Sequence, residues 1–336
     1  ITAGSALRDP VAPRVTTVEL SPQIAKLACQ EFPLLNARLC EDENSHVVVE
    51  DGRMFFKSTR DTFDVVVGDL FVPWRAGVAN LFTREHFTNV RRRLHAEGIF
   101  AQWLPLFQMD SEAFWGIAAT FTEVFPNAWL AIGDFQPHNA AVALIGWKDS
   151  AGAPDWDVME KRTTQLKNLR SNREAVLRSA EGLALFLVGP VASSLPNNVP
   201  VMTQNRPWLG DHAARIERMH PPPMFQGQVL VETLQKIASQ VPPGRMRESV
   251  IAGQLLYQFC GIAESHGLES AGAWYDEHMK RKLPGVIATP RPNRWSWPFP
   301  RAAGRYLVRR ALAEAGYERS VPRQRQQEQP QTGQDP

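Results

Sequence analysis

The sequence predicts an α/β protein built on a mostly parallel, doubly wound sheet. Short, nearly continuous valine runs recur along the first half of the chain, and such runs are typical of strands buried on both faces. Helix-start signals stand between the runs, so strands and helices are expected to alternate. With 43% hydrophobic residues among 336, the chain has enough apolar side chains for a large packed core.

The first strand and helix are expected at residues 15–31. Residues 15–19 read VTTVE, a β-branched run that ends in an acid. Ser21 supplies an N-cap, and Pro22 fits the first position of a helix that runs to about Glu31.

The next elements repeat this pattern. Strands are expected at residues 46–50 (HVVVE) and 64–69 (DVVVGD), and a helix at 83–94 precedes a strand at 99–103. Ser111 is expected to cap the helix that follows. The first part of the chain is therefore predicted to consist of consecutive βα units.

The remaining chain is predicted to be organised differently. Two apolar stretches at 128–132 and 140–147 are expected to form an antiparallel edge of the sheet. Helical spacing then dominates after the triplet Pro221-Pro222-Pro223. We expect a nucleotide-binding α/β domain over residues 1–215, a helical appendage over 221–316 and a disordered tail over 317–336.

Composition limits the partners. Lys and Arg total 37 against 35 Asp and Glu, a net charge of +2 that argues against nucleic acid and favours a small molecule. Apolar runs stay shorter than a membrane span needs. Cys29, Cys40 and Cys260 are odd in number and widely spaced, which predicts neither a disulfide framework nor a Cys-x-x-Cys site and fits a reducing compartment. The histidines lack metal-ligand spacing, so no metal site is expected.

Polar side chains stand at the ends of the predicted strands, where open α/β sheets bind their ligands. Glu19, Asp51, Asp69 and Gln102 occupy these places. A carboxylate at Glu19 can accept both hydroxyl protons of a ribose, and Asp51 would face the adenine amino group. Each acid has a structural alternative, because strand-end acids often cap the next helix and Asp51 with Gly52 is also a favoured turn pair.

Asp69 is the candidate for proton transfer. It stands between a buried strand and the apolar loop 70–74, a placement that could leave its carboxylate partly desolvated and close to substrate. Those conditions suit a general base, and the alternative is again a helix or loop cap.

Five segments resemble, in order and spacing, the polyamine aminopropyltransferase (spermidine synthase) family: VELSPQIAKLACQEFPLLN, VVVEDGRMFF, FDVVVGDLFVPW, LFTREHFTNVRRRL and GIFAQWLPLFQ. The resemblance covers residues 1 to about 210 and is greatest to bacterial domains fused behind a multi-pass membrane region. The opening ITAGSAL resembles the end of the family's glycine-rich loop, and residues 203–207 (TQNRP) resemble its T-D-D-R-P segment.

This resemblance implies a methyltransferase-like Rossmann fold whose first strand and glycine loop precede residue 1. It implies decarboxylated S-adenosylmethionine as co-substrate, no tightly bound cofactor, and transfer of an aminopropyl group to putrescine. By position, Glu19 matches the acid on the ribose hydroxyls, Asp51 with Gly52 the adenine contact, and Asp69 the catalytic aspartate. Gln102 matches a glutamine beside the substrate channel.

One position departs from the family pattern. Val72 stands where the family has the second acid of its gate loop, and with Trp74 it makes the predicted channel apolar. Loss of that carboxylate would weaken the hold on putrescine and favour a different amine. The alternatives are an S-adenosylmethionine-dependent methyltransferase and a non-catalytic binding domain of the same fold. The resemblance also implies a cytoplasmic domain, anchored to the inner membrane through an upstream region in the full-length protein, and leaves a homodimer open.

Overall fold

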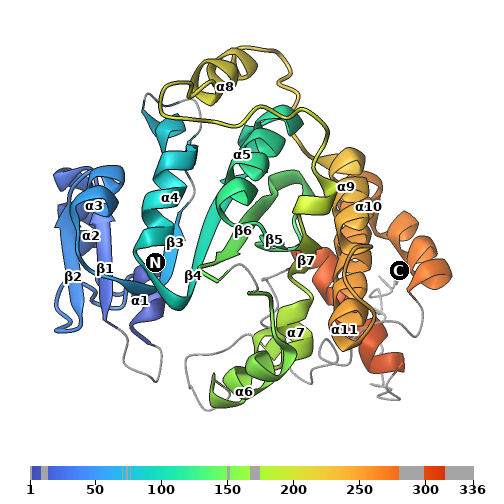
Figure 1. Ribbon diagram of the computed structural model, residues 1–336. Coiled ribbons are helices and arrows are strands. Elements are labelled where there is room, and N and C mark those ends of the chain that lie inside the picture. Colours follow the sequence, from blue (N-terminus) through green and yellow to red (C-terminus); the bar gives the residue numbers. More distant parts are fainter. Residues whose placement is uncertain are drawn as a thin grey trace, which may run out of the picture.

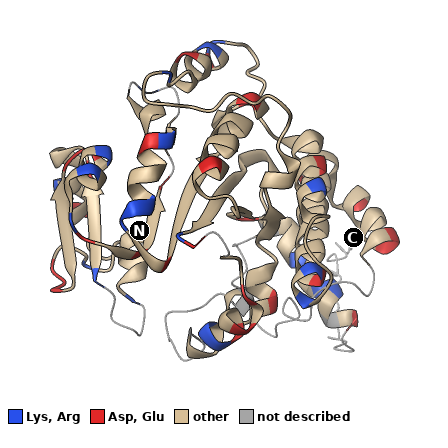
Figure 2. Ribbon diagram, in the orientation of Figure 1, with Lys and Arg blue, Asp and Glu red and all other residues tan. Residues whose placement is uncertain are grey.

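A computed structural model describes residues 2–8, 14–69, 71–72, 75, 77–149, 152–166, 175–279 and 299–314. Strands and helices alternate through the first half of the chain, and helices dominate the second half (Figure 1). The predicted α/β class is confirmed. Figure 2 shows acidic and basic residues interspersed along the helices, as the near-zero net charge implies.

The first sheet holds two parallel strands, β1 (Val15–Glu19) and β2 (Ser45–Val49). Helix α2 (Pro22–Glu31) connects them, and the Ser21 side chain accepts a hydrogen bond from the Ile24 amide at its start. The predicted strand, cap and helix are confirmed here. Two short helices complete this part: α1 (Thr2–Ala6) contacts β1, and α3 (Gly52–Ser58) follows β2.

The second sheet has five strands in the order β3-β4-β6-β5-β7. Its strands are β3 (Phe63–Gly68), β4 (Leu94–Pro105), β5 (Trp129–Ile132), β6 (Ala141–Trp147) and β7 (Leu187–Pro190). Strands β3 and β4 are parallel, and both β4 and β5 are antiparallel to β6, so β3, β4 and β5 point the same way. The predicted antiparallel pair is confirmed, but β6 lies inside the sheet and β7 forms the edge.

Helices surround this sheet. Helix α4 (Arg84–Arg92) begins at its predicted cap, Thr83. The predicted cap of α5 (Ser111–Val124) was wrong by one residue: Ser111 is already the first helical residue, and the Asp110 side chain before it accepts from the Ala113 amide. The other helices are α6 (Trp156–Leu166), α7 (Ala180–Ala184), α8 (Leu209–Glu217), α9 (Gly227–Ala238), α10 (Arg245–His278) and α11 (Arg301–Glu314). Single 3-10 turns lie at Val78–Phe82, Leu106–Gln108, Pro137–Asn139, Ala175–Arg178 and Ala192–Ser194.

Within the described residues the strands form two separate sheets. Within them, β1 pairs only with β2 and β3 pairs only with β4, so each sheet keeps a free edge. Val65 and Val67 on β3 remain 60% and 42% exposed, although their sequence is typical of a fully covered strand. The additional first strand that the resemblance implies stays a prediction.

The core is continuous from the sheet to the last helices. Phe87, Phe100, Phe121 and Phe125 pack ring against ring between α4, β4 and α5. The same buried cluster also includes residues of α9, α10 and α11, namely Leu230, Leu234, Phe259, Tyr275 and Leu307. The helical appendage therefore packs directly on the α/β part, and the boundaries at residues 215 and 221 stay predictions. The predicted disordered tail lies outside the described residues.

Among the described helices, none combines the length and the apolar character that crossing a membrane requires. The predicted absence of disulfides was wrong. Cys29 at the end of α2 bonds to Cys40, with the two Cα atoms 5.6 Å apart. Sequence spacing did not indicate this pair, because the turn that returns the chain has left-handed backbone at Ala37 and Arg38, which few non-glycine residues adopt. Disulfides persist mainly in oxidising compartments, so cytoplasmic localisation stays a prediction.

We expect Cys29→Ser with Cys40→Ser to lower the free energy of unfolding by about 2 kcal/mol, because the cross-link restricts the unfolded chain. Urea unfolding of the parent and double variant measures the difference. Buried Cys260 provides the control, since it forms no disulfide and its thiol is retained in both proteins. Equal free energies of unfolding in the two proteins would contradict a stabilising cross-link. So would a reducing agent that lowers the free energy of unfolding equally in both.

Candidate active site

Glu19 and Asp51 lie at the carboxyl ends of neighbouring strands. Glu19 is the last residue of β1 and is opposite Val49 of β2, and the Glu50 amide donates to the Glu19 carbonyl at 3.1 Å. Asp51 follows one residue later, at the start of α3. The structure therefore brings together the two acids for which the sequence predicted nucleoside contacts.

Glu19 is half-buried, and its Oε1 accepts from the Ser21 amide at 2.9 Å. This contact stabilises the turn into α2, which is the structural role that a strand-end acid often has. The hydrogen bond uses Oε1 alone, so a carboxylate with two oxygens can make this contact and accept from a ligand hydroxyl as well.

Asp51 is held more tightly. Its Oδ1 accepts from the Arg53 amide at 2.8 Å and from Arg53 Nε at 3.1 Å, and Oδ2 accepts from Arg53 Nη2 at 2.7 Å. The hydrogen bonds from the guanidinium lower the pKa of Asp51 below its usual range. Gly52 is the first residue of α3, and no atom lies within 4 Å of where its Cβ would be. Asp51 therefore has the structural role of a helix cap. An adenine amino group that binds Asp51 would have to share its carboxylate with Arg53.

Asp69 and Gln102 form a second pair at the carboxyl edge of the larger sheet. Gly68, just before Asp69, is opposite Gln102 in the β3–β4 register. Asp69 is exposed rather than desolvated, and its Oδ2 accepts from the Thr2 hydroxyl at 3.3 Å. Because Thr2 belongs to α1, which contacts β1, this helix links the two acidic strand ends.

Gln102 is fully buried, so it does not line an open channel in this structure. Its Nε2 donates to the Trp103 carbonyl at 3.0 Å and to the Gly68 carbonyl at 3.4 Å. A Cβ on residue 68 would stand 2.4 Å from Gln102 Oε1, so any larger residue there would displace this amide. Gln102 therefore fixes the end of β3, and with it the place where Asp69 leaves the sheet.

The loop after Asp69 is described only in part. Val72 is half-buried, and the predicted channel residue Trp74 lies outside the described residues. Phe71 packs on the core residue Phe82, with ring centroids 6.2 Å apart. The apolar character of this loop therefore reflects packing against the α4 side of the core, at least at Phe71.

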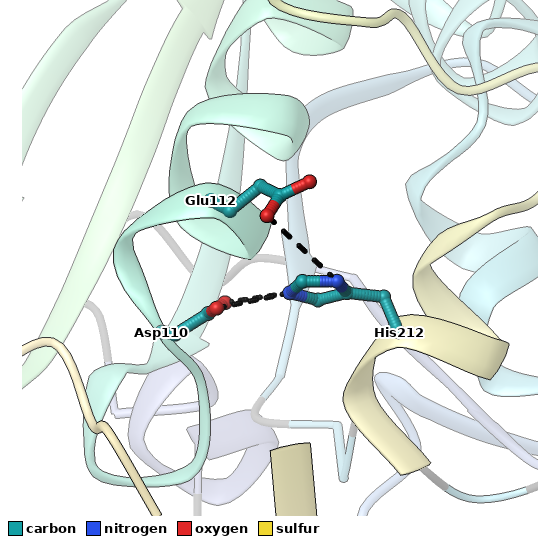
Figure 3. Close-up of side chains that lie close together, drawn as sticks. All are labelled: Asp110, Glu112 and His212. Atoms are coloured by element: carbon teal, nitrogen blue, oxygen red, sulfur yellow. Dashed lines mark hydrogen bonds and ion pairs between the residues drawn. The ribbon is translucent and has the colours of Figure 1, made fainter. Parts of the chain in front are cut away.

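A cluster that the sequence did not indicate joins α5 and α8 (Figure 3). Buried His212 places Nε2 3.0 Å from both oxygens of Asp110, Arg215 Nη2 lies 3.1 Å from Nδ1, and Glu112 is 4.0 Å away. Asp110, Glu112 and His212 bring possible metal-ligand atoms within 4.8 Å of one another. Because Arg215 can only donate, Nδ1 accepts from it and Nε2–H donates to Asp110, so both ring nitrogens are already engaged. The cluster fastens α8 to the start of α5.

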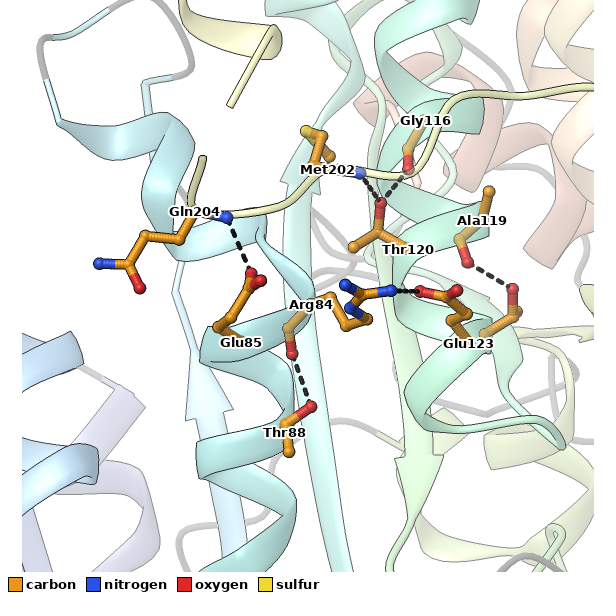
Figure 4. A network of polar contacts seen from close by, with 10 residues as sticks. Arg84, Glu85, Thr88, Gly116, Ala119, Thr120, Glu123, Met202 and Gln204 are labelled. Carbon is orange, nitrogen blue, oxygen red and sulfur yellow. Dashed lines mark hydrogen bonds and ion pairs between the residues drawn. The ribbon is translucent and has the colours of Figure 1, made fainter. Parts of the chain in front are cut away.

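Residues 203–207, which resembled a family motif, continue a segment docked between α4 and α5 (Figure 4). The Met202 amide donates to the Thr120 hydroxyl at 2.9 Å, and the Gln204 amide donates to Glu85 Oε2 at 2.8 Å. The Met202 carbonyl accepts from the Arg84 amide at 2.9 Å. These contacts give the segment a structural role close to the helix that follows the loop of Asp69.

In each sheet a pair of parallel strands ends beside polar side chains, which is the place where open α/β sheets bind small ligands. The sequence profile of the spermine/spermidine synthase domain matches residues 7–132. The matched region is similar to that domain and contains Glu19, Asp51, Asp69 and Gln102.

Curated relatives carry the name polyamine aminopropyltransferase. The protein of Erwinia tasmaniensis is 35% identical over 30% of this chain and 35% of its own length. The protein of Buchnera aphidicola is 31% identical over 46% of this chain and 54% of its own length. The protein of Ruegeria sp. is 24% identical over 43% of this chain and 51% of its own length. The chain therefore spans a third to about half of these relatives.

Solved spermidine synthase structures are also similar. The complex with the transition-state analogue AdoDATO is 18% identical and covers 47% of this chain and 56% of that chain, with a TM-score of 0.40. The Thermotoga maritima enzyme is 18% identical over 47% and 55%, with a TM-score of 0.38.

Proposed function

We propose that this protein transfers an aminopropyl group from decarboxylated S-adenosylmethionine to an amine acceptor such as putrescine. The observation that carries the proposal is the exposed Asp69 carboxylate at the end of β3, inside the matched domain and next to the strand that holds Gln102. Glu19 and Asp51, paired at the ends of β1 and β2, supply carboxylates for the nucleoside half of the same substrate.

The chemistry fits a carboxylate at this place. A primary amine has a pKa near that of lysine, about 10.4, and is mostly protonated at neutral pH. Asp69 would take one ammonium proton, and the freed nitrogen lone pair would attack the methylene carbon next to the sulfonium. The new carbon–nitrogen bond forms as the carbon–sulfur bond breaks, and the sulfur leaves with its electron pair as methylthioadenosine. Because Asp69 is exposed, its carboxylate is accessible to the acceptor amine.

A non-catalytic binding domain is the second candidate, and one observation favours it. Asp51 is occupied by three hydrogen bonds from Arg53, so the adenine contact is available only if that pair rearranges. The valine at position 72 points in the same direction, because it removes a carboxylate that would hold a diamine.

The test is product analysis with the full-length protein. It is incubated with decarboxylated or ordinary S-adenosylmethionine and a panel of amines, and products are identified by mass. We expect an aminopropylated amine and methylthioadenosine in equal amounts, only with the decarboxylated donor. A methylated amine would show that the protein transfers a methyl group instead. If no combination of donor and amine gave a product, the result would support the non-catalytic binding domain. We further propose that the protein is cytoplasmic and forms a homodimer.

A further inference from the structure

The connection from α2 to β2 contains a turn that the Cys29–Cys40 disulfide closes. A buried side chain inside the turn makes a second link to α2. Asn36 Nδ2 donates to the Ala28 carbonyl at 2.7 Å, and Asn36 Oδ1 accepts from the Leu39 amide at 3.3 Å. The turn and the end of α2 therefore form one cross-linked unit.

This turn supports helix α1 through a close contact between backbones. A Cβ on residue 4 would stand 2.0 Å from the Asn36 carbonyl oxygen, so Gly4 of α1 lies directly against the turn. Glycine permits such an approach because it has no side chain, and any other residue would push the helix and the turn apart. The position of α1 therefore depends on the shape of the turn.

Helix α1 also contacts the candidate base. Its Thr2 hydroxyl donates to Asp69 Oδ2 at 3.3 Å. Thr2 and Gly4 belong to the same short helix, so a displacement of Gly4 also moves the Thr2 hydroxyl. A continuous series of contacts, through Asn36, Gly4 and Thr2, thus joins the disulfide-closed turn to Asp69. Chains of packed groups and hydrogen bonds of this kind carry coupling between distant positions.

The backbone of the turn needs the support of its cross-links. Ala37 and Arg38 have φ values of 60° and 56°, in the left-handed region that is unfavourable for residues with a side chain. Such conformations persist only where the surrounding structure imposes them. Opening the disulfide removes one of the two links between the turn and α2. The turn is then free to relax, and α1 loses the surface on which it rests.

The disulfide lies where a thiol in solution can reach it. Cys40 is exposed and Cys29 is half-buried, whereas the free Cys260 is buried. Exposed disulfides are in general the labile and regulatory ones, and disulfides of reducing compartments are usually transient or redox-sensing. Exposure of Cys40 therefore fits a bond that opens and closes rather than a permanent cross-link.

We propose that the Cys29–Cys40 disulfide is a redox-controlled site that positions Asp69 through α1. Its effect on turnover rests on the proposed aminopropyl transfer. In the oxidised protein the closed turn supports α1, and the Thr2 hydroxyl orients the Asp69 carboxylate.

Reduction requires a dithiol. One of its thiolates attacks Cys40 Sγ, the sulfur–sulfur bond of the protein breaks, and Cys29 leaves as a thiolate. The second thiolate of the reductant then displaces Cys40 from the mixed disulfide. Two electrons pass to the protein, both cysteines take up protons, and the dithiol becomes a cyclic disulfide.

The first measurement needs no substrate. The parent, Gly4→Ala and Gly210→Ala are equilibrated with mixtures of reduced and oxidised glutathione, and the free thiols are alkylated and counted by mass. Coupling is reciprocal, so losing the α1 contact must weaken the disulfide by the factor by which the disulfide supports that contact. We expect Gly4→Ala to be half-reduced at an about tenfold lower ratio of [GSH]² to [GSSG]. Gly210→Ala is the control, because a Cβ there meets only Ala79, at 3.5 Å.

The second measurement compares single-turnover transfer by the oxidised protein and by the protein reduced with dithiothreitol. We expect reduction to lower the rate about tenfold while donor binding is retained, because a misplaced base affects the chemical step. Cys29→Ser with Cys40→Ser should show the low rate with or without the reductant. Thr2→Val should also be slow, and Thr2→Ser, which keeps the hydroxyl, should match the parent.

The two measurements separate this proposal from the enzymatic one. If no amine is aminopropylated but Gly4→Ala shifts the thiol equilibrium, the redox coupling stands and the proposed reaction falls. Transfer at the same rate in both redox states would overturn the redox control of Asp69. Equal reduction of Gly4→Ala and the parent would overturn it as well, because the turn and α1 would then be independent.

Discussion

Asp69→Asn is expected to lower aminopropyl transfer by about a thousandfold while binding of decarboxylated S-adenosylmethionine is retained. The amide keeps the size of the side chain and can still accept from the Thr2 hydroxyl, so the end of β3 should keep its shape. It cannot take a proton from the acceptor ammonium, and loss of a general base typically costs between a hundredfold and ten-thousandfold. Single-turnover rates and donor binding, measured on the same preparations, check this result.

Asp64→Asn is the matched control for this variant. Asp64 is an exposed acid on the same strand, and its Oδ1 lies 2.9 Å from His95 Nδ1, away from the carboxyl edge. We expect its turnover to equal that of the parent. If Asp69→Asn also turns over within a few-fold of the parent, Asp69 is not the base. If both variants lose donor binding, the effect is structural.

The second large effect is a loss of stability in acid that depends on His86. His86 is buried between Phe56 and Phe87, and within the described residues its Nδ1 has no partner. Burial, reinforced by the charge of Arg53, lowers its pKa from 6.5 to about 4. Between these values the unfolded chain binds a proton that the folded chain does not. Stability should therefore fall by up to about 3 kcal/mol as the pH falls from about 6.5 to 4.

The measurement is urea unfolding across this pH range in the parent and in His86→Phe, which keeps an aromatic ring in the cluster but cannot be protonated. We expect the variant to lose the acid-induced decrease, whatever its stability at neutral pH. His46→Gln, at an exposed position of β2, should retain the decrease. The same slope in parent and His86→Phe would show that the buried ring is not responsible.

Asp134 contributes with the opposite sign. Because burial raises its folded pKa to about 6, above the usual 3.8, the folded chain binds the extra proton as the pH falls through 6. This protonation stabilises the folded state between about pH 6 and 3.8 and offsets part of the His86 effect. Removing the histidine should therefore leave a curve that is flat or rises slightly in acid.

Much of the local structure could be predicted from sequence. Ser21 and Thr83 cap the helices where expected, because a cap depends on residues within one helical turn. The valine runs form strands as expected, because strand propensity also depends on residues that are adjacent in the sequence. The disulfide could not be predicted, because Cys29 and Cys40 meet only through an unusual left-handed turn at Ala37 and Arg38.

The candidate site was predicted in outline and not in its contacts. Acids at strand ends lie at one edge of a parallel sheet by geometry alone, which is why Glu19 falls next to Asp51 and Asp69 next to Gln102. Whether such a side chain is exposed depends on neighbours elsewhere in the chain. Arg53 occupies Asp51, and packing between β3 and β4 buries Gln102.

The sequence by itself determined the class of fold, the strand-end acids and the resemblance to the spermidine synthase domain, because these depend on periodicity and spacing along the chain. Only the tertiary structure decided that two sheets carry the acids, that Asp69 is exposed and that Gln102 is buried. These features depend on which strands pair and on which side chains from other parts of the chain cover each position. Sequence spacing contains no record of such contacts, so the exposure of each candidate side chain emerged only from the fold.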